Sequence, residues 1–195
     1  MDIRRNLTKE EMFAVKAPSA TRLLRRVFNT DSVFEKIPKS IMKEAQERGT
    51  WVHEQIENHI NGEEVEDRWE WQSYLDAFHE WESKHKIDYL VSEWIIADQT
   101  DFHCKGILDA LAYVDGELCL IDFKTSAKPQ HMDWELQMGV YAYLLYKEYG
   151  LTEDIKLRII MLGRDGRHKM LYYNYDEANI KALIRLYNYK ERMGA

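Results

Sequence analysis

Two aspartates and a lysine stand on either side of a short turn signal, at a spacing suited to binding a metal ion. The dipeptide Asp115-Gly116 is typical of two-residue β-hairpin loops. Asp109 lies six residues before this loop and Asp122 six residues after it, so a hairpin would place the two carboxylates opposite each other, with Cβ atoms roughly 5 Å apart. Lys124 follows Asp122 by two residues, and its side chain would therefore point to the same face.

Facing carboxylates need a positive partner, because like charges directly opposed on a sheet are destabilising, and more so where water is scarce. The other face of the hairpin is apolar and is expected to be core: Leu108, Ala110, Ala112, Val114, Cys119, Ile121 and Phe123. Lys124 is one candidate for the positive partner. A divalent cation is the other, since carboxylate oxygens are hard ligands suited to Mg²⁺ or Mn²⁺. The alternative to a metal site is a structural Asp–Lys ion pair in an unrelated α/β protein.

The sequence predicts an order of helices and strands that would carry this hairpin in a central sheet. A helix is expected after Pro18 with Ser19 as its N-cap, and a second over roughly 38–60. Five apolar residues then recur with helical period and are expected to be core, namely Trp71, Tyr74, Leu75, Phe78 and Trp81. The remaining elements are strands over about 89–96, 106–114 and 117–125, a helix over 132–149, strands over 155–163 and 168–175, and a helix over 176–192. The predicted fold class is α/β, an α+β sandwich with a central mixed sheet of about five strands flanked by helices.

The composition is typical of one well-buried domain. The chain has 195 residues, of which 45% are hydrophobic. No linker or repeat divides it, so we expect a single domain over 1–195, mainly helical over 1–86 and with a sheet core over 87–195. Two cysteines are too few for a disulfide scaffold, a four-thiolate zinc site or an iron–sulfur cluster. No apolar run approaches the roughly 20 residues that span a bilayer, and the N-terminus lacks the apolar stretch of a signal peptide, which predicts a cytoplasmic protein with no membrane partner.

The formal net charge of −7 argues against binding nucleic acid by bulk charge. The charge is unevenly spread, however, because residues 1–50 carry +4, 51–100 carry −10, 101–150 carry −4 and 151–195 carry +3. Basic ends around an acidic middle favour either a nucleic-acid partner or solvated helix faces of opposite sign. Hydroxyls and arginines gather at the start of the first predicted helix, where they form a candidate phosphate contact or an exposed basic face. These residues are Ser19, Thr21, Arg22, Arg25 and Arg26.

Three segments resemble, in order and approximate spacing, the motif series of the PD-(D/E)XK nuclease superfamily: Gly106-Ile-Leu-Asp109, Ile121-Asp122-Phe123-Lys124 and Gln137-Met-Gly-Val-Tyr141. A fourth, Arg48-Gly-Thr-Trp-Val-His53, is similar to a helical motif of the RecB-like exonuclease branch. That branch includes the mitochondrial genome maintenance exonuclease, the CRISPR-associated RecB-like nucleases and phage exonucleases. The resemblance covers roughly residues 17–145. It implies a restriction-endonuclease-like core and, with only two cysteines, a member that lacks an iron–sulfur cluster.

The resemblance also implies a metal centre. Asp109 and Asp122 would ligate one or two Mg²⁺ or Mn²⁺ ions, the main-chain carbonyl of Phe123 would add an oxygen, and His53 an imidazole nitrogen. Lys124 would orient or deprotonate the attacking water and stabilise charge on the phosphate. A bound metal lowers the pKa of water and neutralises charge in the transition state.

Four further residues are expected to support this centre. Gln137 and Tyr141 lie one turn apart on the predicted helix, so both would face the site and would support it or touch the scissile strand. Glu57 lies one turn after His53, and Glu93 lies on the strand before Asp109. Glu57 is a candidate to hydrogen-bond the metal ligands, or else a solvated glutamate, and Glu93 is a candidate to support the ligands or to contribute to the metal site itself.

The leading hypothesis is a metal-dependent DNA exonuclease, or an end- or flap-trimming nuclease, that acts in recombination, repair or replication, as in a phage. The alternatives are a structure-specific endonuclease similar to a junction resolvase, and a non-catalytic nucleic-acid-binding module. The expected partners are single-stranded DNA or duplex ends, together with a single-strand-binding, annealing or helicase protein. No G-x-x-x-x-G-K-[ST] segment is present, so no nucleotide cofactor is expected. If the chain is phage-encoded, it would act in the host cytoplasm.

Overall fold

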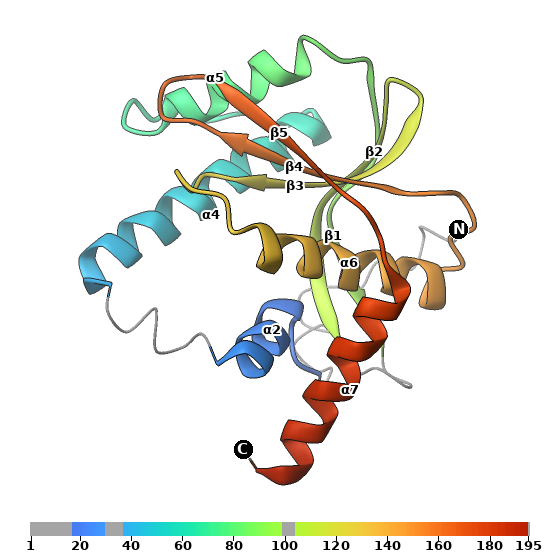
Figure 1. Ribbon diagram of the computed structural model, residues 1–195. Coiled ribbons are helices and arrows are strands. Elements are labelled where there is room, and N and C mark those ends of the chain that lie inside the picture. The colour runs from blue at the N-terminus through green and yellow to red at the C-terminus, as the bar shows by residue number, and fades with distance from the viewer. Residues whose placement is uncertain (1–16, 30–36, 99–103, 195) are drawn as a thin grey trace.

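The computed structural model describes residues 17–29, 37–98 and 104–194, and in it one five-stranded sheet is flanked by helices (Figure 1). The elements are α2 (Ala20–Phe28), α4 (Lys39–Asn61), α5 (Gln72–Glu82), β1 (Ile87–Ala97), β2 (Lys105–Val114), β3 (Glu117–Lys124), α6 (His131–Glu148), β4 (Lys156–Leu162), β5 (His168–Tyr173) and α7 (Glu177–Met193). The expected fold class is confirmed. Among these helices, none is both long and apolar enough to cross a lipid bilayer.

The sheet is mixed, with the strand order β1-β2-β3-β4-β5. The pairs β1–β2, β2–β3 and β4–β5 are antiparallel, whereas β3 and β4 are parallel and are joined through α6. The predicted hairpin turn is present, since Asp115 and Gly116 both have positive φ angles, 52° and 89°. Two left-handed residues are what a type I′ turn requires. The register is also as predicted, with Val114 opposite Glu117 and Ala110 opposite Ile121.

Two separate clusters of buried side chains lie against the sheet. The first is built with α2, α6 and α7, and the second with α4 and α5, so helices cover both faces (Figure 1). In the second cluster, the rings of Phe78 and Trp81 lie 5.5 Å and 5.8 Å from that of Phe123, in edge-to-face contacts. The aromatic stripe of residues 71–81 is therefore core, as predicted. Through Phe123, this cluster packs against β3, the strand that holds Asp122 and Lys124.

One core assignment is wrong, and the error lies next to the predicted site. Leu108 was expected to share a face with Ala110. Instead, Leu108 packs with Trp94 in the first cluster and Ala110 belongs to the second. Between them the strand pair is distorted, because Glu93 has a left-handed φ of 43°, and the neighbouring pairs Ser92–Ala110 and Trp94–Leu108 place it opposite Asp109. Positive φ is rare for a residue with a side chain, and such backbone outliers cluster at functional sites.

Glu80 connects α5 to β5 through hydrogen bonds, and we expect this contact to contribute to the stability of the protein at acid pH. Its carboxylate accepts hydrogen bonds from Lys84 and from the backbone and ring of His168, and these donors lower the pKa of Glu80 to about 2. A carboxyl whose pKa is depressed on folding adds stability above its unfolded pKa of about 4.5 and loses it as the pH falls toward 2. We therefore expect the Tm of wild type to fall more steeply than that of Glu80→Gln between pH 4.5 and 2. Parallel Tm curves for the two proteins would contradict the contact, and Glu64→Gln, an exposed glutamate, is the control.

Candidate active site

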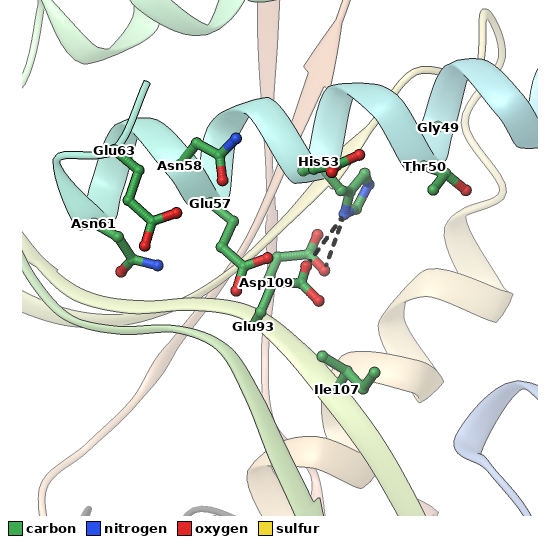
Figure 2. A pocket seen from close by; sticks show the side chains of 11 residues that line it. Gly49, Thr50, His53, Glu57, Asn58, Asn61, Glu63, Glu93, Ile107 and Asp109 are labelled. Atoms are coloured by element: carbon green, nitrogen blue, oxygen red, sulfur yellow. Dashed lines mark ion pairs between the residues drawn. The ribbon is translucent and has the colours of Figure 1, made fainter. Parts of the chain in front are cut away.

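Three side chains from three different elements converge on one point at the middle of β2 (Figure 2). Nδ1 of His53, on α4, lies 3.3 Å from Oδ1 of Asp109, on β2, and 3.8 Å from Oε1 of Glu93, on β1. One donor atom from each residue lies within 4.8 Å of those of the other two. The other oxygen of Asp109 accepts a hydrogen bond of 2.7 Å from the backbone N–H of Phe123, which fixes the carboxylate to β3. An imidazole and two carboxylates form a donor set suited to a divalent cation.

The packing of α4 explains why His53 reaches the strands. Trp51, Val52 and Ile56 are buried in the second core cluster and hold this helix against the sheet. His53 follows directly after Val52, so its ring lies beside the contact and points along the sheet surface toward Asp109 (Figure 2). The apolar face of the helix therefore sets the position of the imidazole.

Asp122 and Lys124 lie on β3 beside this point and form a buried ion pair. Nζ of Lys124 lies 2.6 Å from Oδ2 of Asp122, whose residue is only 4% exposed. This oxygen is buried, and Lys124 is its charged partner. A metal ion bound by Asp122 would therefore share the carboxylate with Lys124, and leaving a buried carboxylate without either cation would be costly.

The charged groups of the site shift one another's pKa values. Burial raises the pKa of Asp122 to about 6, against the pull of Lys124. Burial acts on Asp109 in the same direction, but the hydrogen-bonded His53 outweighs it and holds the pKa of Asp109 below its usual value. Burial would lower the pKa of His53 and of Lys124, yet the neighbouring aspartates raise both. A cation that binds at His53 therefore competes with a proton that the neighbouring carboxylates help to hold on this ring.

The structure favours the more direct of the two expected roles of Glu93. Its carboxylate lies in the same cluster of donor atoms as His53 and Asp109. The left-handed backbone at Glu93 accompanies this placement. Glu57, the other expected supporting residue, lines the same pocket one turn after His53 (Figure 2).

Gln137 and Tyr141 contact each other on one side of α6, and Gln137 lines a hollow together with Lys124. Nε2 of Gln137 donates a hydrogen bond of 3.0 Å to the hydroxyl of Tyr141, which is 5% exposed. The ring of Tyr141 lies directly on the backbone of Gly106, where an added Cβ would be 2.2 Å from its Cε1 atom. Only glycine leaves room for this close approach. The contact packs α6 against β2 three residues before Asp109.

The pocket around this centre has a volume of about 710 Å³ and is strongly acidic. This volume is within the ~300–1,000 Å³ typical of small-ligand sites. Beyond the predicted residues it is lined by Gly49, Thr50, Glu54, Asn58, Asn61, Glu63 and Ile107. Most of these extra residues lie on α4, and the helical period of residues 49–63 is the signal that would have found them.

The five residues predicted to bind DNA lie along one side of α2, from its N-cap to its last turn, where Arg25 and Arg26 are found. Together with Tyr187 and Glu191 of α7 they line one hollow. Thr21 and Arg25 also line a second hollow, which contains Lys124 and Gln137. Within the first hollow, Ser19 accepts a hydrogen bond from the N–H of Arg22 as the cap of α2, and Arg26 forms an ion pair of 2.8 Å with Glu191. The cluster is therefore continuous with the predicted catalytic lysine.

A second basic groove was predicted only in part, because the sequence indicates a phosphate contact at Arg164, Arg167, His168 and Lys169 but not that Arg48 lies beside them. It lies where the chain leaves β3, and its lining includes Arg48, Tyr74, Thr125, Ser126, Arg164, Arg167 and Lys169. Parallel pairing explains this, because β3 and β4 end at the same edge and the β4–β5 turn then lies beside Thr125. Arg48 joins the groove to α4 by donating a hydrogen bond of 3.4 Å to the carbonyl oxygen of Thr125.

Comparison with known proteins gives three matches. The family model of the PD-(D/E)XK nuclease superfamily matches residues 23–192. The Gene 69 protein of Mycobacterium phage D29 is 35% identical over 63 residues, which are 32% of this chain and 22% of that protein, so the match spans about a fifth of that relative's length. The crystal structure of an alkaline exonuclease (LHK-Exo) from Laribacter hongkongensis superimposes with a TM-score of 0.50 and 15% identity, covering 95% of this chain and 94% of that one. At this identity the superposition shows a shared fold.

Proposed function

We infer the chemistry of this chain from its family: it belongs to the PD-(D/E)XK nuclease superfamily, and we propose that it is a metal-dependent DNA exonuclease or an end- or flap-trimming nuclease. The observation that carries this proposal is the convergence of His53, Glu93 and Asp109, with the Asp122–Lys124 pair beside them. The structural likeness to an alkaline exonuclease supports the same reaction class. A role in DNA recombination, repair or replication is part of the proposal.

His53, Asp109 and Asp122 are the proposed ligands of Mg²⁺ or Mn²⁺, together with the carbonyl oxygen of Phe123, and Glu93 is added to them from the structure. When bound, the ion would supply an acidified water and neutralise charge on the phosphate. The carboxylates suit a hard ion, and the buried carboxylate of Asp122 would bind it beside the ammonium group of Lys124.

Lys124 is the proposed partner of the reacting phosphate. Its ammonium group is buried beside Asp122 and is held protonated by the two aspartates, so it presents a positive charge at the site. Such a preorganised charge stabilises negative charge that develops in the transition state. Gln137 and Tyr141 are positioning residues in this proposal, because their hydrogen bond forms the wall of α6 next to Lys124.

The substrate strand is proposed to pass between the two basic surfaces. On one side lie Thr21 and Arg25, in the hollow that contains Lys124. On the other side lies the groove of Arg48 and the β4–β5 turn. Local basic surfaces of this kind reconcile a net charge of −7 with a polyanionic substrate.

A double substitution in the β4–β5 turn should test the second surface. Replacing Arg164 and Arg167 with alanine removes two positive charges from the groove, and we expect the affinity for DNA to fall about tenfold at 0.1 M salt. The slope of log K against log salt should also decrease by about 2, one for each lost phosphate contact. Fluorescence anisotropy on a catalytically silent Asp122→Asn background measures both quantities. Arg185→Ala, an exposed arginine of α7, is the matched control, and an equal loss there would contradict a specific groove.

Cleavage of linear and circular DNA tests the proposed activity. We expect Mn²⁺ to support release of nucleotides from the ends of labelled linear DNA, a chelator to abolish it, and covalently closed circles to resist. Cleavage of the circles would identify an endonuclease instead. If the protein binds DNA but cleaves none of it, with Mg²⁺ or with Mn²⁺, the chain would be a nucleic-acid-binding module and not a nuclease.

A further inference from the structure

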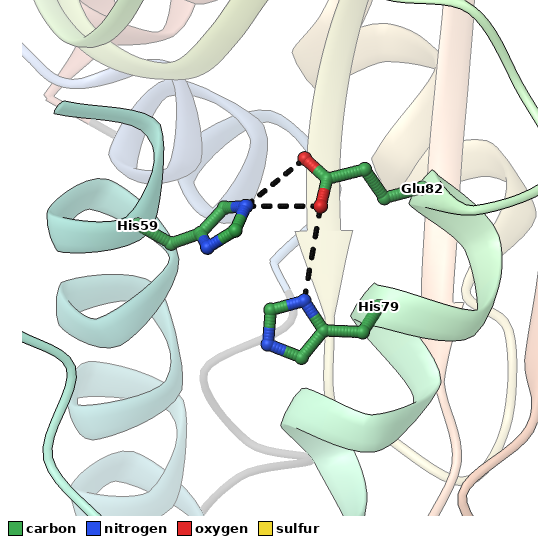
Figure 3. Close-up of side chains that lie close together, drawn as sticks. All are labelled: His59, His79 and Glu82. Atoms are coloured by element: carbon green, nitrogen blue, oxygen red, sulfur yellow. Dashed lines mark hydrogen bonds and ion pairs between the residues drawn. The ribbon is translucent and has the colours of Figure 1, made fainter. Parts of the chain in front are cut away.

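A second cluster of metal-type donors lies away from the acidic pocket, between α4 and α5 (Figure 3). Nε2 of His59, at the end of α4, lies 2.9 Å and 3.2 Å from the two carboxylate oxygens of Glu82 on α5. The nearer of these two oxygens is Oε2. Nδ1 of His79, one turn before Glu82, lies 3.7 Å from this atom. His59 follows His53 by six residues, which is about 9 Å along the helix and about 120° around it, so the two clusters face different directions.

The distances within this cluster match those of a tetrahedral ion. Ligand atoms bound to zinc at ~2.0–2.1 Å lie about 3.3 Å from one another. The two measured separations from Oε2 of Glu82, 2.9 Å to His59 and 3.7 Å to His79, lie on either side of that value, and one donor atom of each residue lies within 4.8 Å of the others. At 3.7 Å, His79 is too far from Glu82 for a hydrogen bond, although both rings point toward this oxygen (Figure 3).

Neighbouring side chains hold the three donors in this arrangement. The fully buried ring of Phe78 contacts the edge of both imidazoles, at 5.4 Å from His59 and 5.2 Å from His79. The hydroxyl of Tyr89 donates a hydrogen bond of 3.2 Å to Oε1 of Glu82, which leaves Oε2 as the atom that faces both rings. Hydrogen bonds of this kind orient the carboxylate ligands of metal sites. All three side chains are partly exposed, so an ion from solvent can reach them.

We propose that His59, His79 and Glu82 bind Zn²⁺ or a similar transition-metal ion, with water in the fourth position, and that this ion fastens α4 to α5. Two imidazoles and one carboxylate favour a borderline ion such as zinc, whereas the carboxylate-rich catalytic pocket favours a hard ion. Because α4 also carries His53, an ion at this second site would fix the helix that positions a catalytic ligand. This site does not depend on the proposed nuclease activity.

Cobalt absorption can test the site in the full chain. An Asp109→Asn/Asp122→Asn background weakens the catalytic pocket, so visible d–d bands on Co²⁺ addition report the second site. We expect intense four-coordinate bands that equimolar Zn²⁺ bleaches and millimolar Mg²⁺ does not. His79→Gln should abolish them, and His85→Gln, a histidine outside the cluster, should leave them unchanged. Bands that persist in His79→Gln, or no bands in the background protein, would overturn the proposal.

Thermal stability provides a second measurement. Zn²⁺ should raise the Tm of the background protein by several degrees, because an ion that binds only the folded state stabilises it, and the rise should vanish in His79→Gln. This variant also loses the ring contact with Phe78 and the approach to Glu82, so the zinc-induced rise is measured against the metal-free Tm of each protein, which separates loss of binding from loss of stability. His79→Gln made in the wild-type chain should retain Mn²⁺-dependent cleavage within twofold, so that the two proposals fail independently. An equal zinc-induced shift in both proteins would overturn the site.

Discussion

Replacing Asp122 with asparagine should lower the rate of Mn²⁺-dependent DNA cleavage by at least about a thousandfold. The substitution keeps the size of the side chain and removes its charge, so the strand and its packing on Phe123 are retained while the proposed metal loses an anionic oxygen. Initial rates on end-labelled DNA at pH 8 measure the effect, since this is well above the pKa of about 6 that burial gives Asp122, and the wild-type carboxyl is then ionised.

Two further measurements make this expectation specific. Mn²⁺ should raise the Tm of wild type but not that of Asp122→Asn, because the lost ligand weakens binding to the folded state. Asp154→Asn, an exposed aspartate outside the site, should behave as wild type in both assays. If Asp122→Asn kept more than a tenth of the wild-type rate at saturating Mn²⁺, Asp122 would not be a metal ligand.

Replacing Gly106 with alanine should destabilise the protein by about 1–3 kcal/mol, the usual cost of overpacking a core. The new Cβ would lie 2.2 Å from Cε1 and 2.9 Å from Cζ of Tyr141, so the buried ring must move. A chain of this size loses about 2–4 °C of Tm per kcal/mol. Movement of the ring also displaces the hydroxyl that Gln137 binds, and cleavage should fall with stability.

A double-mutant cycle separates this clash from a general loss of stability. Gly106→Ala should cost much less in a Tyr141→Ala background, where the space for the new methyl group has been opened. Gly49→Ala is the control, because a Cβ at that helical position meets nothing closer than Oγ1 of Thr125 at 4.0 Å. It should be neutral or slightly stabilising. Equal effects of Gly106→Ala with and without the Tyr141 ring would show that the contact is not the cause.

The hairpin was predictable from the sequence because its register depends only on a two-residue turn. Asp115-Gly116 determines which residues face each other, and the observed pairs agree. The position of His53 followed from a motif and from the helical period around it. The sequence left the role of Glu93 open between the metal site and its support, because its side chain reaches the site through a left-handed backbone that no local pattern signals. The same distortion explains why Leu108 was assigned to the wrong core.

That Arg48 would join the basic residues of the second hairpin in one groove was not predictable, for a different reason. Arg48 and Arg164 are 116 positions apart in the chain, and only the parallel pairing of β3 with β4 brings them to one edge. The sequence predicted a mixed sheet but not its strand order. The cluster of His59, His79 and Glu82 likewise requires the packing of α4 on α5, which the amphipathic pattern of each helix does not specify.

The strand order has a consequence for how the protein folds. Each strand pairs with its neighbour in the chain, and local pairings close with less loss of chain entropy than distant ones. The β1–β2–β3 meander contains Glu93, Asp109 and Asp122 and needs no crossover, whereas β4 joins β3 in parallel through the α6 crossover. We therefore expect the carboxylate half of the site to form earlier in folding than the Gln137–Tyr141 contact on α6.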